Sequence, residues 1–345
     1  MLFISKGVSV KIQITGVTSN QLNIRRKKNP LFSAAKGLLD YFEADQHNEV
    51  INTPELTDAD ILLYGLYSLN SFVSGGFLKT AESITKSIDN RKVVFFVDDW
   101  HIDSIGKNLL ACSKNVDGYL RFGEKLLGRK ATSSERDVYD KALKYIMNSW
   151  APILVHVLPW LVDDDECRND YAKALCVDPD RIVLYDPSLF IEWDVPKPAK
   201  TIYDKQRQWV VASRYDFSRF VNKTMQPSWP VLYYGCKKIP NANFVPNEVD
   251  LVEAAFRPNW GVVSHPYPEH LQGQWRNKFM FSCISHSVIL AYGKETRNMR
   301  TFLSRSEIEK MNEATLRTLA IAQRNEQLDR MNFEKSAERI TKAIK

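Results

Sequence analysis

Residues 93–101 read VVFFVDDWH, and this stretch decides the class of fold. Its first five positions, 93–97, are all apolar and combine β-branched with aromatic side chains, which favours a strand. A strand that is apolar at every position is typical of a parallel sheet whose two faces are both covered by helices. The stretch therefore predicts an α/β protein built on a parallel sheet.

Other apolar runs on either side of this strand alternate with helical patterns. The sequence predicts strands at 8–15, 61–64, 153–158 and 182–185, and then again at 209–212, 231–234, 261–263 and 288–292. Helical patterns lie between them at 29–42, 135–149, 247–256 and 272–284. This alternation predicts repeated βα units and parallel sheets in both halves of the chain.

A segment rich in Pro and Lys without an apolar period, 191–208, separates the two sets of units and is the best linker. We expect an N-terminal Rossmann-like domain at 1–192, a linker at 193–208, a second Rossmann-like domain at 209–303 and helices at 304–345. The two halves would form a clamshell whose sheets face a cleft. The C-terminal helices, which contain no Gly or Pro, are expected to pack outside the second half.

Composition limits the class of protein without identifying it. The chain has 345 residues, 11% aromatic residues and a net charge of +6, which excludes a disordered chain and suits an anionic partner. Its five cysteines are odd in number and widely spaced, as in reduced thiols of an intracellular protein. The longest apolar stretch, 145–162, is interrupted by polar residues and prolines, so no membrane span is expected. The N-terminus lacks the pattern of a secretory signal, and a cytoplasmic protein is expected.

Polar side chains follow the strand at 93–97 directly: Asp98, Asp99, Trp100 and His101. Ligands of open parallel sheets bind beyond the carboxyl ends of the strands, so this is a good catalytic position. Adjacent residues of an extended chain point in opposite directions, so one Asp would face the cleft. The structural alternative is an Asp that caps the next helix.

The second predicted strand precedes a turn that contains Phe72, Gly75 and Gly76. Free backbone amides in such a turn can bind a phosphate or a sugar hydroxyl. The glycine patterns of dinucleotide-binding proteins and of P-loop NTPases are absent from the sequence. A basic run, Arg25, Arg26, Lys27 and Lys28, fits either contact with nucleic-acid phosphates or a solvated loop.

In the second half, polar and basic residues again lie near predicted strand and helix ends. Ser213, Arg214 and Arg219 follow the strand at 209–212, and Arg276 and Lys278 lie at the start of a predicted helix. Guanidinium groups and the amides of a helix N-terminus together suit a pyrophosphate. Solvated surface charge is the alternative for each residue taken alone.

Several segments, taken in order, resemble a known family: 60–76, 94–101, 211–219, 231–235, 238–240 and 275–291. The chain resembles the T-even bacteriophage DNA β-glucosyltransferases, which are GT-B enzymes that transfer glucose from UDP-glucose to 5-hydroxymethylcytosine in DNA. The resemblance implies two Rossmann-like domains whose parallel sheets face each other across a cleft, with a helical C-terminus. It also implies a UDP-sugar donor, a duplex DNA acceptor with a hydroxymethylated cytosine or uracil, and action in the cytoplasm of an infected bacterial host.

The resemblance assigns roles to residues. Asp99 falls at the position of the family's catalytic aspartate and would act as a general base in an inverting displacement. The donor set implied is Gly16, Ser213, Arg214, Arg219, Gly235, Ile239, Arg276 and Lys278. The acceptor set is Arg25, Arg26, Lys27, Lys28, Phe72, Gly75, Gly76, Asp98, Trp100 and His101, with Phe72, Trp100 and His101 as contacts for a flipped base. Related enzymes use Mg²⁺ or Mn²⁺ with the diphosphate, and a monomer is expected.

Two alternatives remain open at the level of sequence. One is a GT-B glycosyltransferase that acts on a small molecule, a lipid or a cell-wall precursor. The other is an inactive protein that binds a nucleotide sugar or DNA, because Phe281 stands where the family has a donor-binding Glu. Retention instead of inversion is also left open, since GT-B folds host both outcomes.

Overall fold

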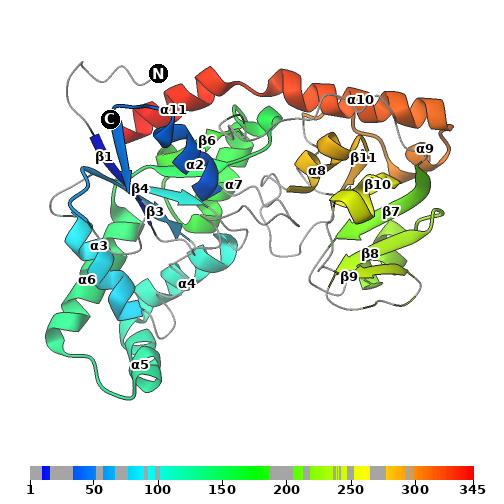
Figure 1. Ribbon diagram of the computed structural model, residues 1–345. Coiled ribbons are helices and arrows are strands. Elements are labelled where there is room, and N and C mark those ends of the chain that lie inside the picture. The colour runs from blue at the N-terminus through cyan, green and yellow to red at the C-terminus, as the bar shows by residue number, and fades with distance from the viewer. Residues whose placement is uncertain are drawn as a thin grey trace.

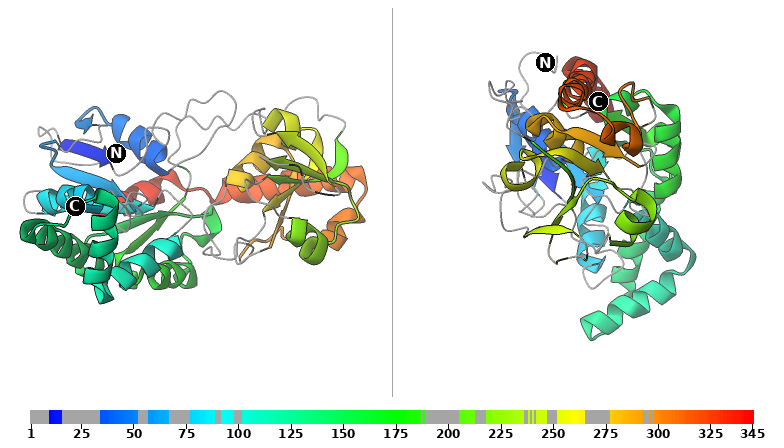
Figure 2. Two further views of the ribbon diagram at one scale, coloured as in Figure 1. Left: turned by 90° about the horizontal axis from the view of Figure 1, so that it is seen from below. Right: turned by 90° about the vertical axis from the view of Figure 1, so that its right-hand side faces the viewer.

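The computed structural model describes residues 10–15, 34–51, 57–66, 77–88, 92–97, 102–186, 188, 205–212, 218–235, 238, 240, 242–246, 252–264, 277–292, 296 and 298–345. These residues form two lobes, each built around a parallel sheet (Figure 1). The two lobes lie side by side along the length of the molecule, as the left view of Figure 2 shows, and the right view of Figure 2 looks along that length.

In the first lobe, the sheet has the strand order β2-β1-β3-β4-β5-β6, and every described pairing is parallel. Its strands are β1 (Val10–Thr15), β2 (Asn48–Ile51), β3 (Ile61–Gly65), β4 (Lys92–Val97), β5 (Ile153–His156) and β6 (Ile182–Tyr185). The apolar run 93–97 lies in β4 at the centre of this sheet, where Val94, Phe95 and Phe96 are fully buried. Helices on both faces explain why this strand is apolar at every position.

Helix α2 (Ala34–Glu43) covers one face of this sheet. The other face packs against α3 (Phe77–Ile88), α4 (Ile102–Lys114), α6 (Ser133–Asn148) and α7 (Asp165–Leu175). Two short 3-10 turns, η2 (Pro159–Leu161) and η3 (Pro179–Arg181), flank α7. Helix α5 (Val116–Leu127) projects beyond the rest of the lobe (Figure 1).

The second lobe has a sheet in the order β11-β10-β7-β8-β9, again parallel in each described pairing. Its strands are β7 (Gln206–Ala212), β8 (Val231–Gly235), β9 (Asn243–Pro246), β10 (Asn259–Ser264) and β11 (Val288–Ala291). The π-helical turn η5 (Phe220–Met225), α9 (Arg305–Glu309) and α10 (Glu313–Arg330) cover one face, and η6 (Val252–Phe256) lies on the other. Helix α8 (Asn277–Ser285) packs beside η6, β10 and β11.

The sequence predicts that the C-terminal helices all pack on the second half. The structure shows that this is wrong for one of them. Helix α10 packs there, because Leu316 lies in the core of the second lobe. Helix α11 (Phe333–Ile344) returns to the first lobe, where Ile340 and Ile344 join the core that contains Phe96 (Figure 1). The physical reason is the apolar stripe of α11, which covers the face of the first sheet that α2 leaves open.

The two lobes meet through buried aromatic rings. Trp160 of η2 and Phe279 of α8 pack edge to face, with ring centroids 5.6 Å apart. Phe279 is 1% exposed and belongs to the same apolar cluster as residues of the first sheet. A polar contact lies in the same region, where Asn298 donates from Nδ2 to the Asp164 carboxylate at 2.8 Å. The lobes are therefore joined by a packed contact as well as by the chain.

The structure corrects the end of the predicted linker. Residues 206–208, assigned to the linker for their polarity, are part of β7, the central strand of the second sheet. Their neighbour Lys205 is 9% exposed, and its ammonium donates to Ser285 O at 2.8 Å and Ser287 Oγ at 3.0 Å. The prediction was wrong because it took polar residues to be exposed. Here buried acceptors satisfy the lysine, so a polar segment can lie inside the lobe.

Two short strands, β2 and β9, were not predicted from the sequence. Both lie at an edge of their sheet, and both are partly exposed. An edge strand needs no continuous apolar run, so the pattern that found the central strands is absent from these two. Across the residues that the structure describes, no helix combines the length and the apolar character needed to cross a membrane.

Candidate functional site

The order of the strands locates a ligand site in each lobe. After β1, the chain adds β2 on one side of β1 and then β3 on the other side. The order in which strands are added to the first sheet therefore reverses between β1 and β3. The second sheet reverses between β7 and β10 in the same way. Open α/β sheets bind ligands at the carboxyl ends of the strands next to such a reversal. Thr15, Gly65, Ala212 and Ser264 mark these ends.

Most residues that the sequence assigns to the site follow such strand ends but lie outside the described residues. They are Gly16, Arg25, Arg26, Lys27, Lys28, Phe72, Gly75, Gly76, Asp98, Asp99, Trp100, His101, Ser213, Arg214, Ile239 and Arg276. In the chain, Gly16 directly follows β1, Ser213 directly follows β7, and Asp99 comes two positions after the end of β4. Their assigned roles stay predictions from the sequence.

Three predicted donor residues are described: Gly235 at a strand end, Arg219 before η5 and Lys278 in α8. Arg219 precedes η5 directly, and its side chain is exposed to solvent. Gly235 is the last residue of β8 and is buried. Lys278 is partly buried in the first turn of α8. The structure therefore leaves the Arg219 guanidinium accessible to an anionic ligand.

Lys278 lies next to the contact between the lobes. Its neighbour Phe279 packs on Trp160, and Trp160 follows the carboxyl end of β5 in the first lobe. The first turn of α8 therefore lies where the second lobe meets the carboxyl side of the first sheet. The unpaired amides and the dipole at a helix N-terminus favour anions, and a lysine in that turn adds to the effect.

Ser264 is a polar group of this region that the sequence analysis missed. It ends β10, at the reversal point of the second sheet, and its side chain is fully buried. Its Oγ makes no hydrogen bond within the described part of the chain. The signal in the sequence was weak, since a single serine at the end of an apolar strand is common. The structure adds this hydroxyl to the candidate donor site.

His156 also ends a strand, β5, but its surroundings favour a structural role. It is 6% exposed and stacks on Tyr185 with ring centroids 5.2 Å apart and planes 12° apart. Burial lowers the pKa of its imidazole to about 3, so His156 is neutral at physiological pH. A group that does not titrate near pH 7 is poorly suited to general acid or base catalysis there.

Comparisons with known proteins agree on the fold. No family model matches the chain, and no curated protein matches it. A structure of T4 phage BGT in complex with its UDP-glucose substrate matches with a TM-score of 0.52 and 15% identity, over 97% of this chain and 99% of that chain. A structure of the DNA-modifying enzyme β-glucosyltransferase, studied with and without uridine diphosphoglucose, matches with a TM-score of 0.52, 13% identity and the same coverage. The fold is of the GT-B type. This confirms the fold class that the sequence predicts.

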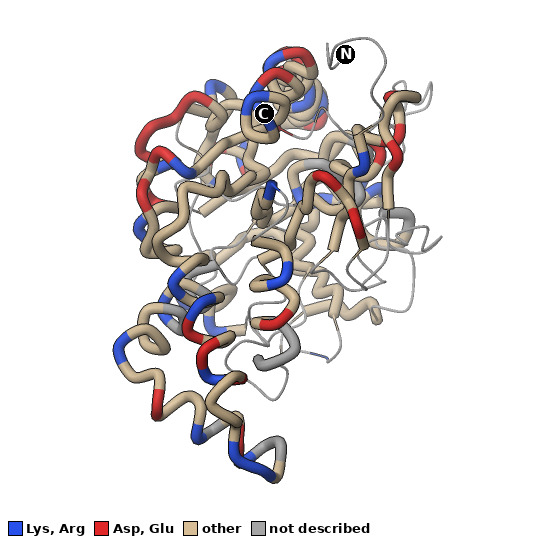
Figure 3. The backbone as a smooth tube through the Cα atoms, turned by 90° about the vertical axis from the view of Figure 1, so that its left-hand side faces the viewer, with Lys and Arg blue, Asp and Glu red and all other residues tan. Residues whose placement is uncertain are grey.

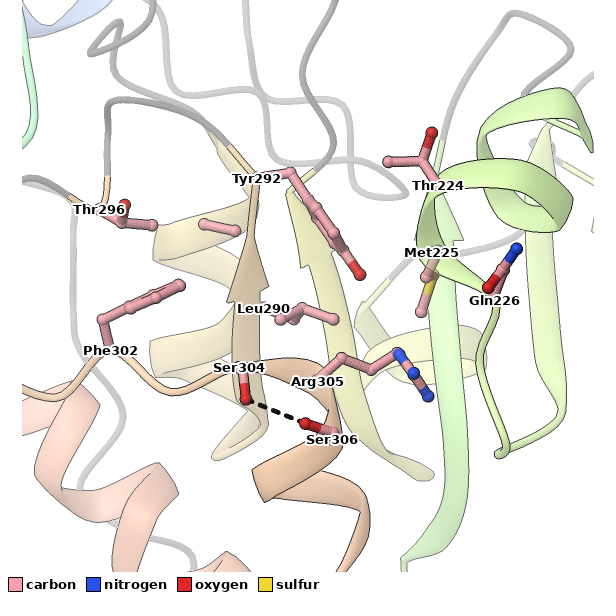
Figure 4. Close-up of a pocket in the computed structure, with 11 residues that line it drawn as sticks. Thr224, Met225, Gln226, Leu290, Tyr292, Thr296, Phe302, Ser304, Arg305 and Ser306 are labelled. Carbon is pink, nitrogen blue, oxygen red and sulfur yellow. Dashed lines mark hydrogen bonds between the residues drawn. The ribbon is translucent and has the colours of Figure 1, made fainter.

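A separate hollow of about 650 Å³ lies in the second lobe of this GT-B fold, between η5, the end of β11 and the start of α9 (Figure 4). It is lined by Thr224, Met225, Gln226, Leu290, Ala291, Tyr292, Thr296, Phe302, Ser304, Arg305 and Ser306. Of the predicted site residues that the structure describes, Arg219, Gly235 and Lys278, none lines it. Its walls come from segments far apart in the chain, so no local pattern could have found it.

The charged group of this hollow is already neutralised. Arg305 pairs with Glu309 one helical turn later, and the Glu309 carboxylate also accepts from Trp209 Nε1 at 2.9 Å. Burial raises the pKa of Tyr292 to about 12, so its hydroxyl stays protonated. These contacts hold α9 on the sheet, and they supply no net charge for the diphosphate of a nucleotide sugar.

Among the described residues, no group of three or more His, Cys, Asp or Glu side chains could hold a metal ion. The side chains present there do not fit a protein-held divalent metal.

Proposed function

We propose that this protein is a glycosyltransferase that moves a sugar, glucose by preference, from a UDP-sugar to the hydroxymethyl group of a 5-hydroxymethylpyrimidine in duplex DNA. The observation that carries the proposal is the agreement in fold over nearly the whole of both chains with T4 phage BGT, whose structure was determined with UDP-glucose. The second match is described as a DNA-modifying enzyme. An enzyme of this kind would act in the cytoplasm of an infected bacterial host.

The donor would bind to the second lobe. Two described basic residues of that lobe are Arg219 beside η5 and Lys278 in the first turn of α8. Their charges would bind the diphosphate and stabilise the negative charge that grows on it as the sugar leaves. Ser213, Arg214, Gly235, Ile239 and Arg276 complete the set that the resemblance implies.

The chemistry would centre on Asp99. Its carboxylate would take the proton of the hydroxymethyl group while the hydroxyl oxygen forms a bond to the anomeric carbon. The bond between that carbon and the diphosphate oxygen breaks at the same time, and UDP leaves with the electron pair. A single displacement of this kind inverts the anomeric configuration. A positioned general base typically contributes about 10² to 10⁴ in rate.

The acceptor would have to leave the base stack, because the hydroxymethyl group of a paired base cannot reach a residue at a strand end. The enzyme would therefore flip the target nucleotide into the cleft. Phe72, Trp100 and His101 are the side chains proposed to contact it. Gly16, Gly75, Gly76, Asp98 and the run 25–28 would line the path of the sugar or the DNA.

The test is transfer of labelled glucose from UDP-glucose to duplex DNA that carries hydroxymethylcytosine or hydroxymethyluracil. We expect the wild type to transfer the label and Asp99→Asn to lose transfer by about 10² to 10⁴ while it still binds UDP. Asp137→Asn is the matched control, since Asp137 is an exposed carboxylate on α6 of the same lobe. Transfer only to small acceptors, or DNA binding without transfer, would contradict the proposal.

A further inference from the structure

The first lobe carries an arm, defined here as residues 114–132, which comprises the end of α4, all of α5 and the turn into α6. Figures 1 and 2 show α5 projecting away from the sheet of the first lobe. Among the arm side chains whose burial is described, Leu120 is the one fully buried apolar side chain, and Val116 and Tyr119 pack partly buried against the same core. The Lys and Arg side chains of the arm are all exposed, so they can contact a partner.

Charge is concentrated in this arm. It contains five Lys or Arg residues and two Asp or Glu residues, a surplus of three positive charges. The whole chain has a net charge of +6, so the 19 residues of the arm carry half of it. Lys and Arg residues recur along the arm down to its lower end in Figure 3.

The carboxylates of the arm are already used in local contacts. Asp117 pairs with Arg136 of α6, and Glu124 accepts from the backbone amide of Ala131 at 2.8 Å. Glu135 of α6 forms two hydrogen bonds with the guanidinium of Arg129, at 2.8 and 2.6 Å. The Arg129 guanidinium beside it lowers the pKa of Glu135 to about 2, so the carboxylate stays ionised. These acids do not neutralise the remaining lysines.

Four cations of the arm therefore stay uncompensated. Lys114, Lys125 and Lys130 are exposed, and none of them contacts a carboxylate within the described residues. Arg121 is exposed too, and its Nε donates only to the carbonyl of Asp117 at 3.2 Å. Arg121 and Lys125 are one helical turn apart, so they lie on the same side of α5.

The backbone that carries these cations is held by local contacts. Asn115 caps α5 by accepting from Gly118 N at 3.1 Å, and Gly128 ends the helix in the left-handed conformation at φ 69°. Thr132 and Glu135 form a capping box at the start of α6. A basic surface held in place in this way loses less entropy on binding than a flexible basic tail would.

We propose that the arm binds the phosphate backbone of the acceptor duplex, on one side of the target base. This inference rests on the proposed function. Helix α4 starts three positions after Asp99 in the chain, and its 13 residues span about 20 Å. That length corresponds to roughly six base pairs at about 3.4 Å per pair. The arm would thus grip DNA about six base pairs from the reacting nucleotide.

The test compares Lys125→Gln/Lys130→Gln with the control Lys310→Gln/Lys342→Gln. The control removes the same charge from exposed lysines on α9–α10 and α11. Binding is measured for a duplex of about 30 base pairs and one of about 8, each with a central hydroxymethylated base, over a range of salt. Each lost phosphate contact lowers the slope of log K against log salt by about 0.9. For the arm variant on the long duplex, we expect the slope of log K against log salt to be smaller in magnitude by up to about 1.8.

On the short duplex, which does not reach the arm, we expect the arm variant, the control and the wild type to bind and to transfer sugar equally. Equal melting temperatures would show that all three proteins are folded. Equal salt slopes for the arm variant and the control on the long duplex would overturn the inference. If the wild type binds the long duplex with a larger salt slope than the arm variant but transfers no sugar, the proposed function fails and the arm remains a DNA contact. If the wild type binds no DNA, both fail.

Discussion

The ring of Phe279, in the second lobe, packs edge to face on Trp160, in the first lobe, with centroids 5.6 Å apart. Both rings are at least nine-tenths buried. The contact lies beside Lys278 and beyond the carboxyl end of β5, so it joins the lobes on the side where the candidate site lies. The position of Lys278 relative to the first lobe therefore depends on this pair.

Replacement of Phe279 tests that dependence. We expect Phe279→Ala to lower the free energy of unfolding by about 3–5 kcal/mol, because it leaves a cavity between the lobes. Phe279→Leu, which retains most of the apolar volume, should cost less. Urea denaturation followed by fluorescence measures both variants. A loss below about 1 kcal/mol for the alanine variant would show that the contact does not join the lobes.

Arg219 gives a test of the donor site. We expect Arg219→Ala to weaken UDP binding by roughly 10-fold or more, because a hydrogen bond between charged groups is worth about 1.5–3 kcal/mol. Titration calorimetry with UDP measures the change. Lys223→Ala is the matched control, since Lys223 is an exposed cation of η5. Equal affinities for the two variants would place the diphosphate elsewhere.

The low pKa of His156 predicts that the folded protein loses stability in acid. Its pKa is lowered to about 3 in the folded protein, against an ordinary value of 6.5 in the unfolded chain. Between these values the unfolded state binds the additional proton, so stability falls as the pH drops from 6.5 towards 3. Relative to neutral pH, this group lowers the free energy of unfolding by about 2–3 kcal/mol at pH 4.5.

The variant His156→Phe keeps a ring that can stack on Tyr185 but has no group that titrates. We expect its stability to fall less than that of the wild type between pH 6.5 and 4.5. Unfolding in urea at a series of pH values measures the difference. The same acid dependence in both proteins would show that another group is responsible.

The attachment of α11 to the first lobe depends on Arg339 more than on Lys335. Arg339 donates to Val162 O at 2.9 Å and to Leu184 O at 3.2 Å, and it also pairs with Asp163. The more exposed Lys335 contacts the same carboxylate. We expect Arg339→Ala to cost about 1–3 kcal/mol, because it leaves carbonyls without donors.

The matched variant Lys335→Ala should cost less than about 1 kcal/mol, as an exposed ion pair does. Hydrogen exchange of the α11 amides measures both variants, since release of the helix speeds exchange. Equal exchange rates in the two variants would show that the carbonyl contacts of Arg339 do not hold the helix.

Local patterns were sufficient for the central strands. The run at 93–97 is apolar at every position because β4 is covered on both faces, and that environment leaves a clear trace in the sequence. The polar residues that follow this run mark the end of the strand. Edge strands such as β9 leave no such trace, because solvent covers part of them.

The sequence by itself determined the fold class and the strand ends at which a ligand site can lie, since both follow from residues adjacent in the chain. Only the tertiary structure decided that Phe279 meets Trp160, that Lys205 has buried acceptors and that α11 returns to the first lobe. Each of these depends on packing between segments far apart in the chain. Such contacts are set by which apolar surfaces remain uncovered once the sheets have formed, and no local pattern records that.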